Sequence, residues 1–526
     1  MHPTEDQTRY QAFKAHDARF DGHFFVGVSS THIYCRPVCR VKLPKFENCH
    51  FFDLAVQAES AGYRPCLRCR PELAPSSLPW TTQDASQTLA IQAARWLDEP
   101  LAWQGKDTQN ADPADSKPSI SQLAAHLGVS DRHVRRLFEA QFGVSPLQYL
   151  QTRRLLTAKQ LLTDTDMPIA QVALCSGFGS VRRFSAAFLA HYRLNPSQLR
   201  RSTTDVNISK VKSNSSAFCT VKLSYRPPYD SRWLLEFFQK RQISSIEFVS
   251  IKANKSSAGW TLRLDSGGKQ HTGWIAAEFV QHQPTVLLQV SDSLRDVLPQ
   301  VIRQVRALLD LDADPLAINA VLGDCFDCAG DVSGLRVPGC LNGFELAVRA
   351  ILGQQVTVAA GRTFTQRVVD TFGSAIETPF PALSRLFPTP EALAQASDED
   401  LGRLGIVKQR QAALVALARA VASKQLPLHP SADIEVTMTA LRALPGVGDW
   451  TAQYIAMRAL RWPDAFVAGD VALHKAMGLQ NQDPLLSPTK TAAAAVATSQ
   501  VWRPWRSYAV MRAWTSLSQK SNPIDK

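Results

Sequence analysis

Four cysteines near the N-terminus stand in two closely spaced pairs. Cys35 and Cys39 lie in YCRPVCR, and Cys66 and Cys69 lie in RPCLRCR. Each pair can offer two sulfurs to one ion from a single tight turn, and four thiolates complete a tetrahedral zinc shell. We therefore predict one Zn²⁺ bound by all four cysteines, which would also stabilise a small domain with little core of its own. The alternative is four buried free thiols; Cys49, between the pairs, is interpreted as a core residue.

Arginines adjoin these cysteines, among them Arg36 and Arg40. Such cations would hold a phosphate backbone nearby, and the electron-rich sulfur of a four-thiolate zinc site could attack an alkyl group on a phosphate. The segments FVGVSSTHIYCRPVCR and ENCHFFDLAVQAESAGYRPCLRCRPE resemble the N-terminal domain of the Ada DNA methylphosphotriester repair proteins, over residues 8–75. The resemblance implies that Cys35 accepts the methyl group and that the other three cysteines complete the zinc shell.

Two later segments share the pattern of a helix, a glycine-containing turn and a second helix. They are SISQLAAHLGVSDRHVRRLFEAQFG and PIAQVALCSGFGSVRRFSAAFLAHYR, separated by a long helix expected from Pro146 to Leu162. Ser130 is the expected N-cap of the second helix in the first segment. One alternative is a basic helical bundle with solvated faces. Two such units in succession resemble the AraC-type DNA-binding domain, which implies recognition helices in successive major-groove segments. The arginines expected to be exposed there are Arg132, Arg135, Arg136, Arg182 and Arg183.

A third motif, LPGVGDWTAQYIAMRAL, covers residues 444–460. Gly446 and Gly448 would let backbone amides approach a DNA phosphate at a helix N-terminus without reading sequence. Asp470 follows Gly448 by 22 residues, and this arrangement resembles the helix-hairpin-helix base-excision glycosylases. The resemblance places Asp470 on the catalytic aspartate of that family. The alternative is that Asp470 only caps a helix, and the two roles are compatible.

The resemblance extends over residues 218–520 to the 3-methyladenine DNA glycosylase II family, AlkA. It is carried by VKLSYRPPYDSRWLLEFF, LRVPGCLNGFELAVRAILGQQVTVAAGRT and WRPWRSYAVMRAW. It implies alkylated purines such as 3-methyladenine and 7-methylguanine as substrates, whose positive charge already weakens the glycosidic bond. Asp470 would stabilise the developing sugar cation and guide water. Four aromatic residues match the family's cleft, where cation–π attraction would hold the base, although each could be ordinary core: Phe237, Trp450, Tyr454 and Trp514.

Several positions depart from related families. Trp450 stands where bifunctional relatives carry a lysine, so no Schiff base can form there and we expect a glycosylase without lyase activity. Gln355 stands where the DNA wedge is commonly apolar, and Val471 and Thr515 replace possible cleft tyrosines. The departure at Gln355 affects how strongly the wedge residue would act on the duplex. Those at Val471 and Thr515 affect how many kinds of base the cleft would accept.

The elements that must position these residues belong to several domains. A chain of 526 residues exceeds the size at which a single hydrophobic core keeps growing, so we expect three or four domains. The net charge is +12, and eleven Lys or Arg against four Asp or Glu between Ser130 and Arg201 account for +7 of it. This concentration is typical of a nucleic-acid-binding module. The family resemblances imply that its partner is double-stranded DNA. We expect no transmembrane helix and no signal peptide, hence a reducing compartment in which cysteines serve as ligands.

The expected fold is a small α+β zinc domain, an all-α double helix-turn-helix domain, a small α+β domain with an antiparallel sheet, and an all-α helix-hairpin-helix domain. Short alternating runs such as TVLLQVS predict the strands, and longer periodic runs predict the helices. The expected boundaries are 1–75 for the zinc methyl-acceptor domain, 76–201 for a linker and the AraC-type domain, 202–217 for a second linker, 218–300 for the AlkA-like N-terminal domain and 301–526 for the glycosylase domain.

Together the resemblances imply a bacterial alkylation-repair fusion that hydrolyses the glycosidic bond of alkylated purines and transfers methyl groups from phosphotriesters to Cys35. They further imply transcriptional regulation through RNA polymerase, by a monomer in the cytoplasm associated with the nucleoid. One alternative is a methylation-responsive transcription factor whose glycosylase domain is weak or inactive. Another is a glycosylase whose N-terminal half only targets DNA, with an inert Cys35. The PCHR motif of O6-methylguanine methyltransferases is missing from the sequence, so that activity is not expected.

Overall fold

The computed structural model divides the chain into two compact units. One unit comprises Met1–Lys222, Leu264–His271 and Val290–Ile302, and the other comprises Leu223–Arg263, Thr272–Gln289 and Arg303–Lys526. In the described part of the chain, no helix is both long enough and apolar enough to span a membrane. The structure describes residues 5–16, 20–39, 41–74, 85–98, 120–165, 167–204, 218–252, 255–266, 269–281, 283–328, 330–430, 432–479 and 488–521.

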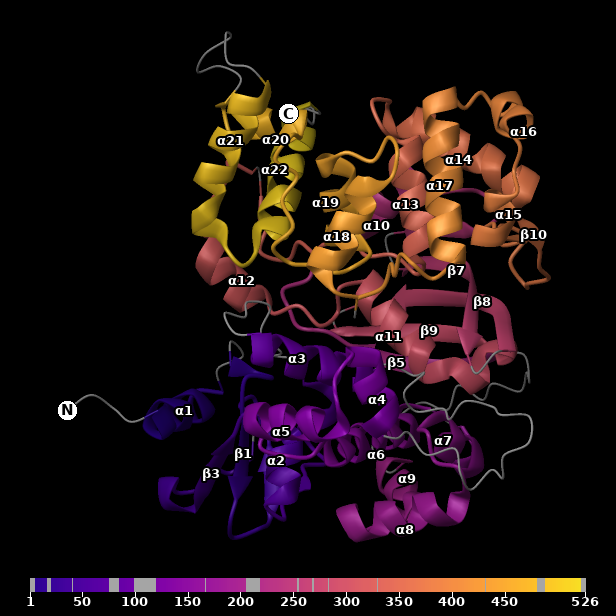
Figure 1. Ribbon diagram of the computed structural model, residues 1–526. Helices are drawn as coiled ribbons and strands as arrows, with labels where there is room; N and C mark the ends of the chain where they lie inside the picture. The colour runs from indigo at the N-terminus through magenta and orange to yellow at the C-terminus, as the bar shows by residue number, and fades with distance from the viewer. Residues whose placement is uncertain are drawn as a thin grey trace. The chain divides into compact units, whose positions relative to one another are not determined.

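The first unit begins with a small four-stranded sheet in the order β3-β1-β2-β4 (Figure 1). Strand β1 pairs antiparallel with β2 and β3, whereas β2 and β4 are parallel. The buried side chains of Phe13, Phe24 and Val26 pack together with Cys35 in the core of this part. The expected α+β zinc domain is thus confirmed. Its elements are α1 (Glu5–Lys14), β1 (Phe25–Val28), β2 (Ile33–Cys35), β3 (Cys49–Phe52), α2 (Ala55–Ser60) and β4 (Arg64–Pro65).

A helical region completes the first unit and contains both expected helix-turn-helix segments. The Ser130 and Ser180 hydroxyls cap the second helix of each segment. The preceding turns pass through Gly128 at φ +67° and Gly177 at φ +79°, a backbone region that disfavours residues with a Cβ. The long helix between the segments ends at Asp164, two residues beyond the expected end. The helices are α3 (Ala85–Asp98), α4 (Ile120–Leu127), α5 (Asp131–Phe142), α6 (Pro146–Asp164), α7 (Ile169–Cys175), α8 (Val181–Tyr192) and α9 (Pro196–Thr204).

Buried ion pairs join the second cysteine turn to helix α6. The Lys159 ammonium pairs with Glu72, each side chain being only 1% exposed, and it also donates to the Cys66 carbonyl at 3.3 Å. Arg70 in turn pairs with Glu72 at 3.0 Å and with Asp164 at 2.6 Å. Charges this deeply buried are tolerated only when they are paired and hydrogen-bonded. The turn that carries Cys66 is therefore held by the helix that separates the two helix-turn-helix segments.

A second buried carboxylate, Glu59 of α2, also connects the small sheet to the helical region. It accepts hydrogen bonds from the Tyr34 hydroxyl at 2.9 Å and the Thr152 hydroxyl at 2.6 Å, and its other partner is His191 of α8 at 2.7 Å. Tyr34 directly precedes Cys35 on β2, Thr152 lies on α6 and α8 is the second helix of the later helix-turn-helix segment. Glu59 thus links the strand that ends at Cys35 to both of these helices.

A five-stranded sheet in the order β5-β9-β8-β7-β6 follows, confirming the expected small α+β domain. Strands β6 and β7 pair antiparallel, with Glu247 opposite Trp260. Helix α10 packs on β6 and is capped by Asp230, whose side chain accepts the N–H of Trp233 at 2.8 Å. The elements are β5 (Phe218–Ser224), α10 (Ser231–Arg241), β6 (Glu247–Lys252), β7 (Lys255–Ser266), β8 (Lys269–Phe279) and β9 (Thr285–Ser291).

After the sheet the chain is helical, apart from the short pair β10 and β11, and the helices from α12 onward share one large hydrophobic core. In Figure 1, α20 and α22 lie side by side, as do α18 and α19. The all-α domain expected from the sequence is confirmed. Its elements are α11 (Leu298–Leu308), α12 (Pro315–Leu322), α13 (Gly343–Leu352), α14 (Val358–Phe372), β10 (Ser374–Ala375), β11 (Arg385–Leu386), α15 (Pro390–Ala394), α16 (Asp398–Arg403), α17 (Lys408–Ala422), α18 (Ile434–Ala443), α19 (Asp449–Arg458), α20 (Val471–Ala476), α21 (Pro488–Thr498) and α22 (Arg506–Ser521).

The Lys159–Glu72 pair leads to a first prediction about stability. Lys159→Met leaves the Glu72 carboxylate buried with one cation fewer, and breaking a buried pair costs about 3–5 kcal/mol. Guanidinium unfolding of the full chain, followed through zinc release, measures the loss. Arg153→Met is the matched control on the same helix, because the Arg153 side chain is 41% exposed in its pair with Asp98, and such a pair contributes under about 1 kcal/mol. Equal losses in the two variants would contradict a structural role for the buried pair.

Candidate functional site

The four cysteines of the first unit are brought together by two turns of the small sheet. Strand β2 ends at Cys35, and the turn that follows brings Cys39 back toward Cys35. In this turn the Cys39 N–H donates to the Arg36 carbonyl at 3.1 Å. Strand β4 runs parallel to β2, and the Cys66 N–H donates to the Tyr34 carbonyl at 2.9 Å. Parallel pairing therefore sets the second cysteine turn beside the first.

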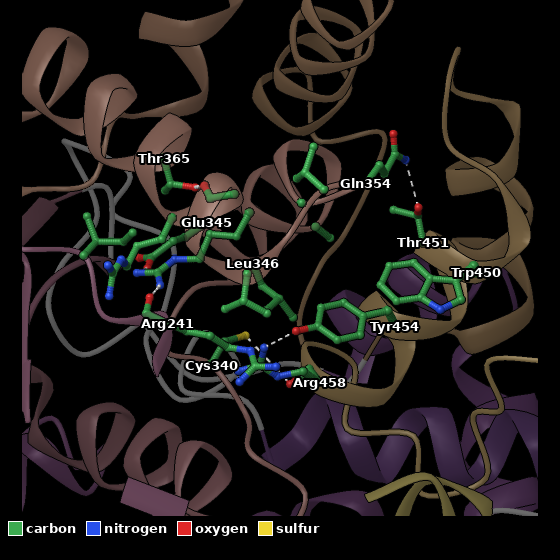
Figure 2. Close-up of a pocket in the computed structure, with 18 of the residues that line it drawn as sticks. Arg241, Cys340, Glu345, Leu346, Gln354, Thr365, Trp450, Thr451, Tyr454 and Arg458 are labelled. Atoms are coloured by element: carbon green, nitrogen blue, oxygen red, sulfur yellow. Dashed lines mark hydrogen bonds and ion pairs between the residues drawn. The ribbon is translucent and has the colours of Figure 1, made fainter. Parts of the chain in front are cut away.

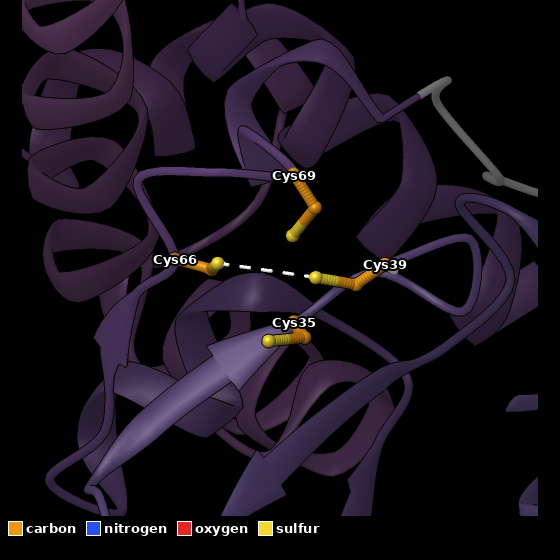
Figure 3. Close-up of side chains that lie close together, drawn as sticks. All are labelled: Cys35, Cys39, Cys66 and Cys69. Atoms are coloured by element: carbon orange, nitrogen blue, oxygen red, sulfur yellow. Dashed lines mark hydrogen bonds between the residues drawn. The ribbon is translucent and has the colours of Figure 1, made fainter. Parts of the chain in front are cut away.

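The spacing of the four sulfurs fits a single zinc ion. All four lie within 4.8 Å of one another, and those of Cys39 and Cys66 are 4.0 Å apart (Figure 3). A tetrahedral Zn²⁺ with Zn–S distances of about 2.3 Å needs sulfurs roughly 3.8 Å apart. When bound, the metal would keep the sulfurs deprotonated. Among the described residues, this is the one group of three or more His, Cys, Asp or Glu side chains with such spacing, and Cys49 lies outside it.

The arginines beside the cysteines differ in what they contact. Arg36 donates to the buried Asp21 carboxylate at 2.8 Å and to the Cys69 carbonyl at 2.9 Å, and only 13% of its side chain is exposed. Its backbone N–H also donates to Cys69 Sγ at 3.3 Å. Arg36 therefore stabilises the two turns that carry the cysteines. The sequence-based prediction was that Arg36 contacts a DNA phosphate. Arg40 lies outside the described residues, and Arg68 is exposed.

The arginines predicted on the two recognition helices are all exposed. Helix α5 buries Val134, Phe138 and Phe142 on its opposite face, and α8 likewise buries Phe184 and Phe188. The amphipathic pattern therefore leaves a cationic face on each helix, which suits contacts to phosphates and to base edges. The exposed set is Arg132, Arg135, Arg136, Arg182 and Arg183.

In the second unit, Asp470 lies at the start of α20 between two tryptophans. Its Oδ1 accepts the Leu473 N–H at 2.7 Å and the Trp514 indole N–H at 3.0 Å. Its Oδ2 accepts the Trp450 indole N–H at 2.9 Å. The first of these bonds is a helix N-cap, and the other two fix the plane of the carboxylate. The geometry therefore accommodates both roles considered for Asp470.

A pocket of about 1160 Å³ opens beside this carboxylate (Figure 2). The Trp450 and Tyr454 rings are parallel within 9°, with centroids 5.2 Å apart, and the Trp514 ring lies 6.4 Å from Tyr454. All three rings line the pocket together with Asp470. Flat aromatic faces next to a fixed anion are suited to a purine and to the sugar cation that forms when its bond breaks.

The hairpin glycines form part of the same pocket. Gly446 has φ +72°, and nothing lies within 4 Å of a Cβ built on Gly448, so the backbone at the start of α19 is open to a phosphate. Gln354 donates to the Gly446 carbonyl and to the Thr451 hydroxyl, both at 2.9 Å. This ties the loop before α14 to the hairpin. Gln355, the next residue in that loop, is exposed at the pocket with φ +53°.

Three further positions discussed for the cleft are Phe237, Thr515 and Val471, and only Val471 lines the pocket. Phe237 is 8% exposed and is not among the residues that line the described pocket, because the Arg241 guanidinium covers its ring at 3.7 Å. Thr515 is buried and donates to the Met511 carbonyl at 2.8 Å, away from the lining. Val471 does line the pocket and is 69% exposed.

Two arginines that the sequence motifs did not indicate also line the pocket, Arg241 and Arg458. Nη1 of Arg458 donates to the Tyr454 phenol oxygen at 2.5 Å. Burial raises the pKa of the Tyr454 phenol, but Arg458 and Arg241 outweigh burial, so the pKa is lowered. Helical spacing was the available signal, since Trp450, Tyr454 and Arg458 recur every four residues on α19 and share one face.

Four family models match successive parts of the chain. The metal binding domain of Ada matches residues 8–72, and a helix-turn-helix domain matches residues 123–202. The AlkA N-terminal domain matches residues 220–342. The HhH-GPD superfamily of base excision DNA repair proteins matches residues 348–498, which include the hairpin glycines and Asp470.

Similar proteins match either nearly the whole chain or one part of it. The chain is 34% identical to the "Probable bifunctional transcriptional activator/DNA repair enzyme AlkA" of Mycobacterium tuberculosis, over 98% of this chain and 97% of that protein. It is 33% identical to DNA-3-methyladenine glycosylase 2 of Escherichia coli, over 56% of this chain and 95% of that protein. It is 29% identical to the bifunctional transcriptional activator/DNA repair enzyme AdaA of Bacillus subtilis, over 37% of this chain and 82% of that protein.

A second prediction concerns the metal. Cys66→Ser removes one of four clustered sulfurs, so zinc content measured by mass spectrometry of the metal should fall from about one ion per chain to well below it. Cys49→Ser is the matched control, because Cys49 lies in the same domain but outside the cluster, and its zinc content should equal that of the wild type. Loss of zinc from both variants would show that the cluster alone does not define the site.

Proposed function

The chain belongs to the family of AlkA-type bifunctional transcriptional activators and DNA repair enzymes, and from this membership we propose how its two units act on alkylated DNA. The second unit hydrolyses the N-glycosidic bond of alkylated purines of the 3-methyladenine and 7-methylguanine class. The first unit takes a methyl group once from a DNA methyl phosphotriester and regulates transcription. The observation that carries the glycosylase assignment is the Asp470 carboxylate fixed between two indoles at an aromatic pocket.

In the proposed glycosylase reaction, Asp470 supplies negative charge where positive charge develops. The bond between the base and the sugar breaks with its electron pair on the base, and the Asp470 carboxylate stabilises the sugar cation. Water then adds to the sugar, and its proton leaves to the base or to solvent. Trp450, Tyr454 and Trp514 hold the base by stacking, which also favours a cationic purine. Trp450 offers no amine, so we propose hydrolysis without strand cleavage.

The structure around the hairpin supports a common way of holding DNA. The backbone at Gly448 has open space for a phosphate, and this contact reads no sequence. Gln355 projects from the neighbouring loop at the pocket, where a wedge would fill the space left by the flipped nucleotide. Because Gln355 is polar, we propose that its amide forms hydrogen bonds in the duplex, a contact that an apolar wedge cannot make.

For the first unit, we propose that a cysteine thiolate attacks the methyl carbon of a phosphotriester. A sulfur–carbon bond forms, the carbon–oxygen bond breaks, and the phosphodiester leaves as an anion. Two observations bear on which sulfur reacts. Cys69 is the more exposed, whereas Cys35 is 3% exposed. The Cys69 sulfur, however, accepts the Arg36 N–H, which withdraws charge from it. We propose Cys35 as the acceptor, which requires its turn to open toward DNA.

The exposed arginines of α5 and α8 support binding of double-stranded DNA by the first unit. We further propose that this unit binds promoter DNA as a monomer, that it contacts RNA polymerase and that the protein works in the cytoplasm on the nucleoid. The other candidate is a transcription factor with a weak glycosylase. The hydrogen-bonded Asp470 disfavours this candidate, because the central carboxylate and its aromatic surroundings are all present.

A third prediction tests the glycosylase. Asp470→Asn keeps the size and the capping oxygen but removes the negative charge, so release of 3-methyladenine should fall by about 10²-fold or more. Single-turnover release from methylated DNA measures the rate, and anisotropy with duplex DNA should show that binding persists. Asp398→Asn is the control, because Asp398 is an exposed aspartate of α16 outside the pocket. Wild-type release by Asp470→Asn would reduce Asp470 to a helix cap.

A fourth prediction concerns the methyl acceptor. One methyl group should appear on Cys35, with zinc retained, when the protein is incubated with DNA carrying methyl phosphotriesters. The formal charge of the zinc site then moves from about −2 to about −1, so DNA binding should tighten by up to about tenfold. The gain in affinity should be larger at low salt than at high salt. Peptide mass spectrometry and titrations at two salt concentrations measure both effects. Methyl found on Cys69 would move the acceptor, and methyl on Cys35 with unchanged affinity would remove the electrostatic switch.

A further inference from the structure

The two recognition helices of the first unit, α5 and α8 (Figure 1), have the same length and the same register. Each has 12 residues and follows a serine whose hydroxyl accepts the N–H three residues later, Ser130 for α5 and Ser180 for α8. Each ends at a residue in the left-handed region, Gly143 at φ +70° or Arg193 at φ +57°. Both helices bury their fourth, eighth and twelfth residues. Residues that are equally far from the two serines therefore face the same way.

Opposite its buried side, each helix presents an outward stripe of exposed residues. Spacings of four, three and four place the members of a stripe on one helical face. The stripe consists of Arg132, Arg136, Glu139 and Gly143 on α5, and of Arg182, Ala186, Leu189 and Arg193 on α8. The first position is therefore an arginine on both helices. The two middle positions differ, because they are charged on α5 and apolar on α8.

The centre of the α8 stripe is apolar and its ends are cationic. Leu189 is 45% exposed, although the buried side of the same helix takes large apolar side chains such as Phe188. A single exposed leucine is normal on a protein surface. Here Ala186 lies one turn before it, and Arg182 and Arg193 close the stripe at its two ends. Such a face is complementary to a surface that is apolar in its middle and anionic at its edges.

The major groove of duplex DNA is such a surface wherever it contains thymine. Its edges are the phosphates of the two strands, about 12 Å apart. At about 1.5 Å per residue, the Cα atoms of Arg182 and Arg193 are separated by roughly 16 Å, so their long side chains can reach phosphates while the centre of the stripe faces the bases. Thymine alone among the four bases presents an apolar group there, its C5 methyl, and apolar side chains are the groups that contact it.

The middle of the α5 stripe suits a different base pair. An arginine donates to O6 and N7 of guanine, and a carboxylate accepts a hydrogen bond from N4 of cytosine. Arg136 and Glu139 provide these two groups one helical turn apart. The Arg136 guanidinium is also hydrogen-bonded to Nδ1 of His133 at 3.1 Å, which restricts its orientation. Helix α5 is therefore suited to G·C pairs, for which α8 has no matching groups in the middle of its stripe.

We propose that the two recognition helices read different base pairs. Helix α8 reads thymine methyl groups through Ala186 and Leu189, and α5 reads G·C pairs through Arg136 and Glu139. This inference rests on the proposed binding of promoter DNA by the first unit, and it names the chemistry that each helix recognises. A site with one thymine-containing half and one G·C half is not palindromic. The unit therefore binds its site in one orientation, as expected for a monomer whose two helix-turn-helix segments differ.

The test uses the full-length protein, which first selects its preferred site from random duplex DNA at a fixed salt concentration. Each thymine of that site is then replaced in turn by deoxyuridine, which lacks only the C5 methyl and keeps every hydrogen-bonding group. Affinity should fall by about two- to fourfold for each contacted methyl group, the effect of losing one buried methyl. The sensitive thymines should lie together in one half of the site, and G·C pairs should be selected in the other half.

Variants of α8 show whether its stripe makes these contacts. Leu189→Ala should remove most of the difference in affinity between thymine and deoxyuridine at the sensitive positions. Leu147→Ala is the matched control, because Leu147 of α6 is 47% exposed and lies outside both recognition helices, so the difference should persist. The double change Ala186→Arg with Leu189→Glu gives α8 the middle residues of α5. It should change the base pairs selected in that half of the site from A·T to G·C.

Several results would overturn the inference. Unchanged affinity after every deoxyuridine replacement is one, and a difference between thymine and deoxyuridine that survives Leu189→Ala is another. If Leu189→Ala lowers promoter activation without changing affinity for DNA, the apolar stripe contacts a protein and the inference is also wrong. If the wild-type protein selects no sequence at all, the proposed promoter binding fails instead. Each variant changes an exposed position, and zinc content measured on the same preparations shows that the first unit has folded.

Discussion

In the proposed glycosylase reaction, the carboxylate of Asp470 is the group on which the chemistry of the second unit depends. Three N–H donors from three segments converge on it: Leu473 of α20, Trp450 of α19 and Trp514 of α22. A carboxylate that only capped a helix would need the first donor alone. The two indoles hold the anion in one orientation before any substrate arrives, so the proposed reaction would need no reorganisation of this carboxylate as the sugar becomes positive. Because the same indole rings line the pocket, the groups that orient the anion also shape the space for the base.

In the first unit, two buried carboxylates hold the segments that carry the four metal-binding cysteines. Glu72 lies three residues after Cys69 and bonds to Lys159 of α6, and Glu59 joins the strand of Cys35 to α6 and α8. Neither carboxylate could remain buried without these partners. The cysteine turns are therefore held by helices of the DNA-binding region as well as by their own sheet. The segments that carry the cysteines therefore share buried contacts with α6 and α8.

The parts that the sequence predicted well are those defined by local spacing. The cysteine pairs, the hairpin glycines and the Ser130 cap each depend on a few consecutive residues, and the structure has them as expected. The contacts that the motifs did not indicate concern the direction of a side chain. Arg36 adjoins a zinc ligand in the sequence, yet it turns to Asp21, a partner on a preceding loop. Phe237 matched a cleft aromatic, yet the arginine four residues later on the same helix covers its ring. Both choices are set by tertiary contacts that no single motif contains.

The pocket of the second unit combines two electrostatic preferences that are usually considered separately. Its aromatic faces and Asp470 favour positive charge, whereas Arg241 and Arg458 favour negative charge. The two sets do not cancel, because they are separated by Tyr454, with Trp450 stacked on its ring and the Arg458 guanidinium bonded to its oxygen. Glycosidic cleavage itself separates charge in this way, since the sugar becomes positive while the base gains electrons. A pocket that is negative at the sugar and positive at the far edge of the base is complementary to that transition state, which a uniformly negative cleft would not be.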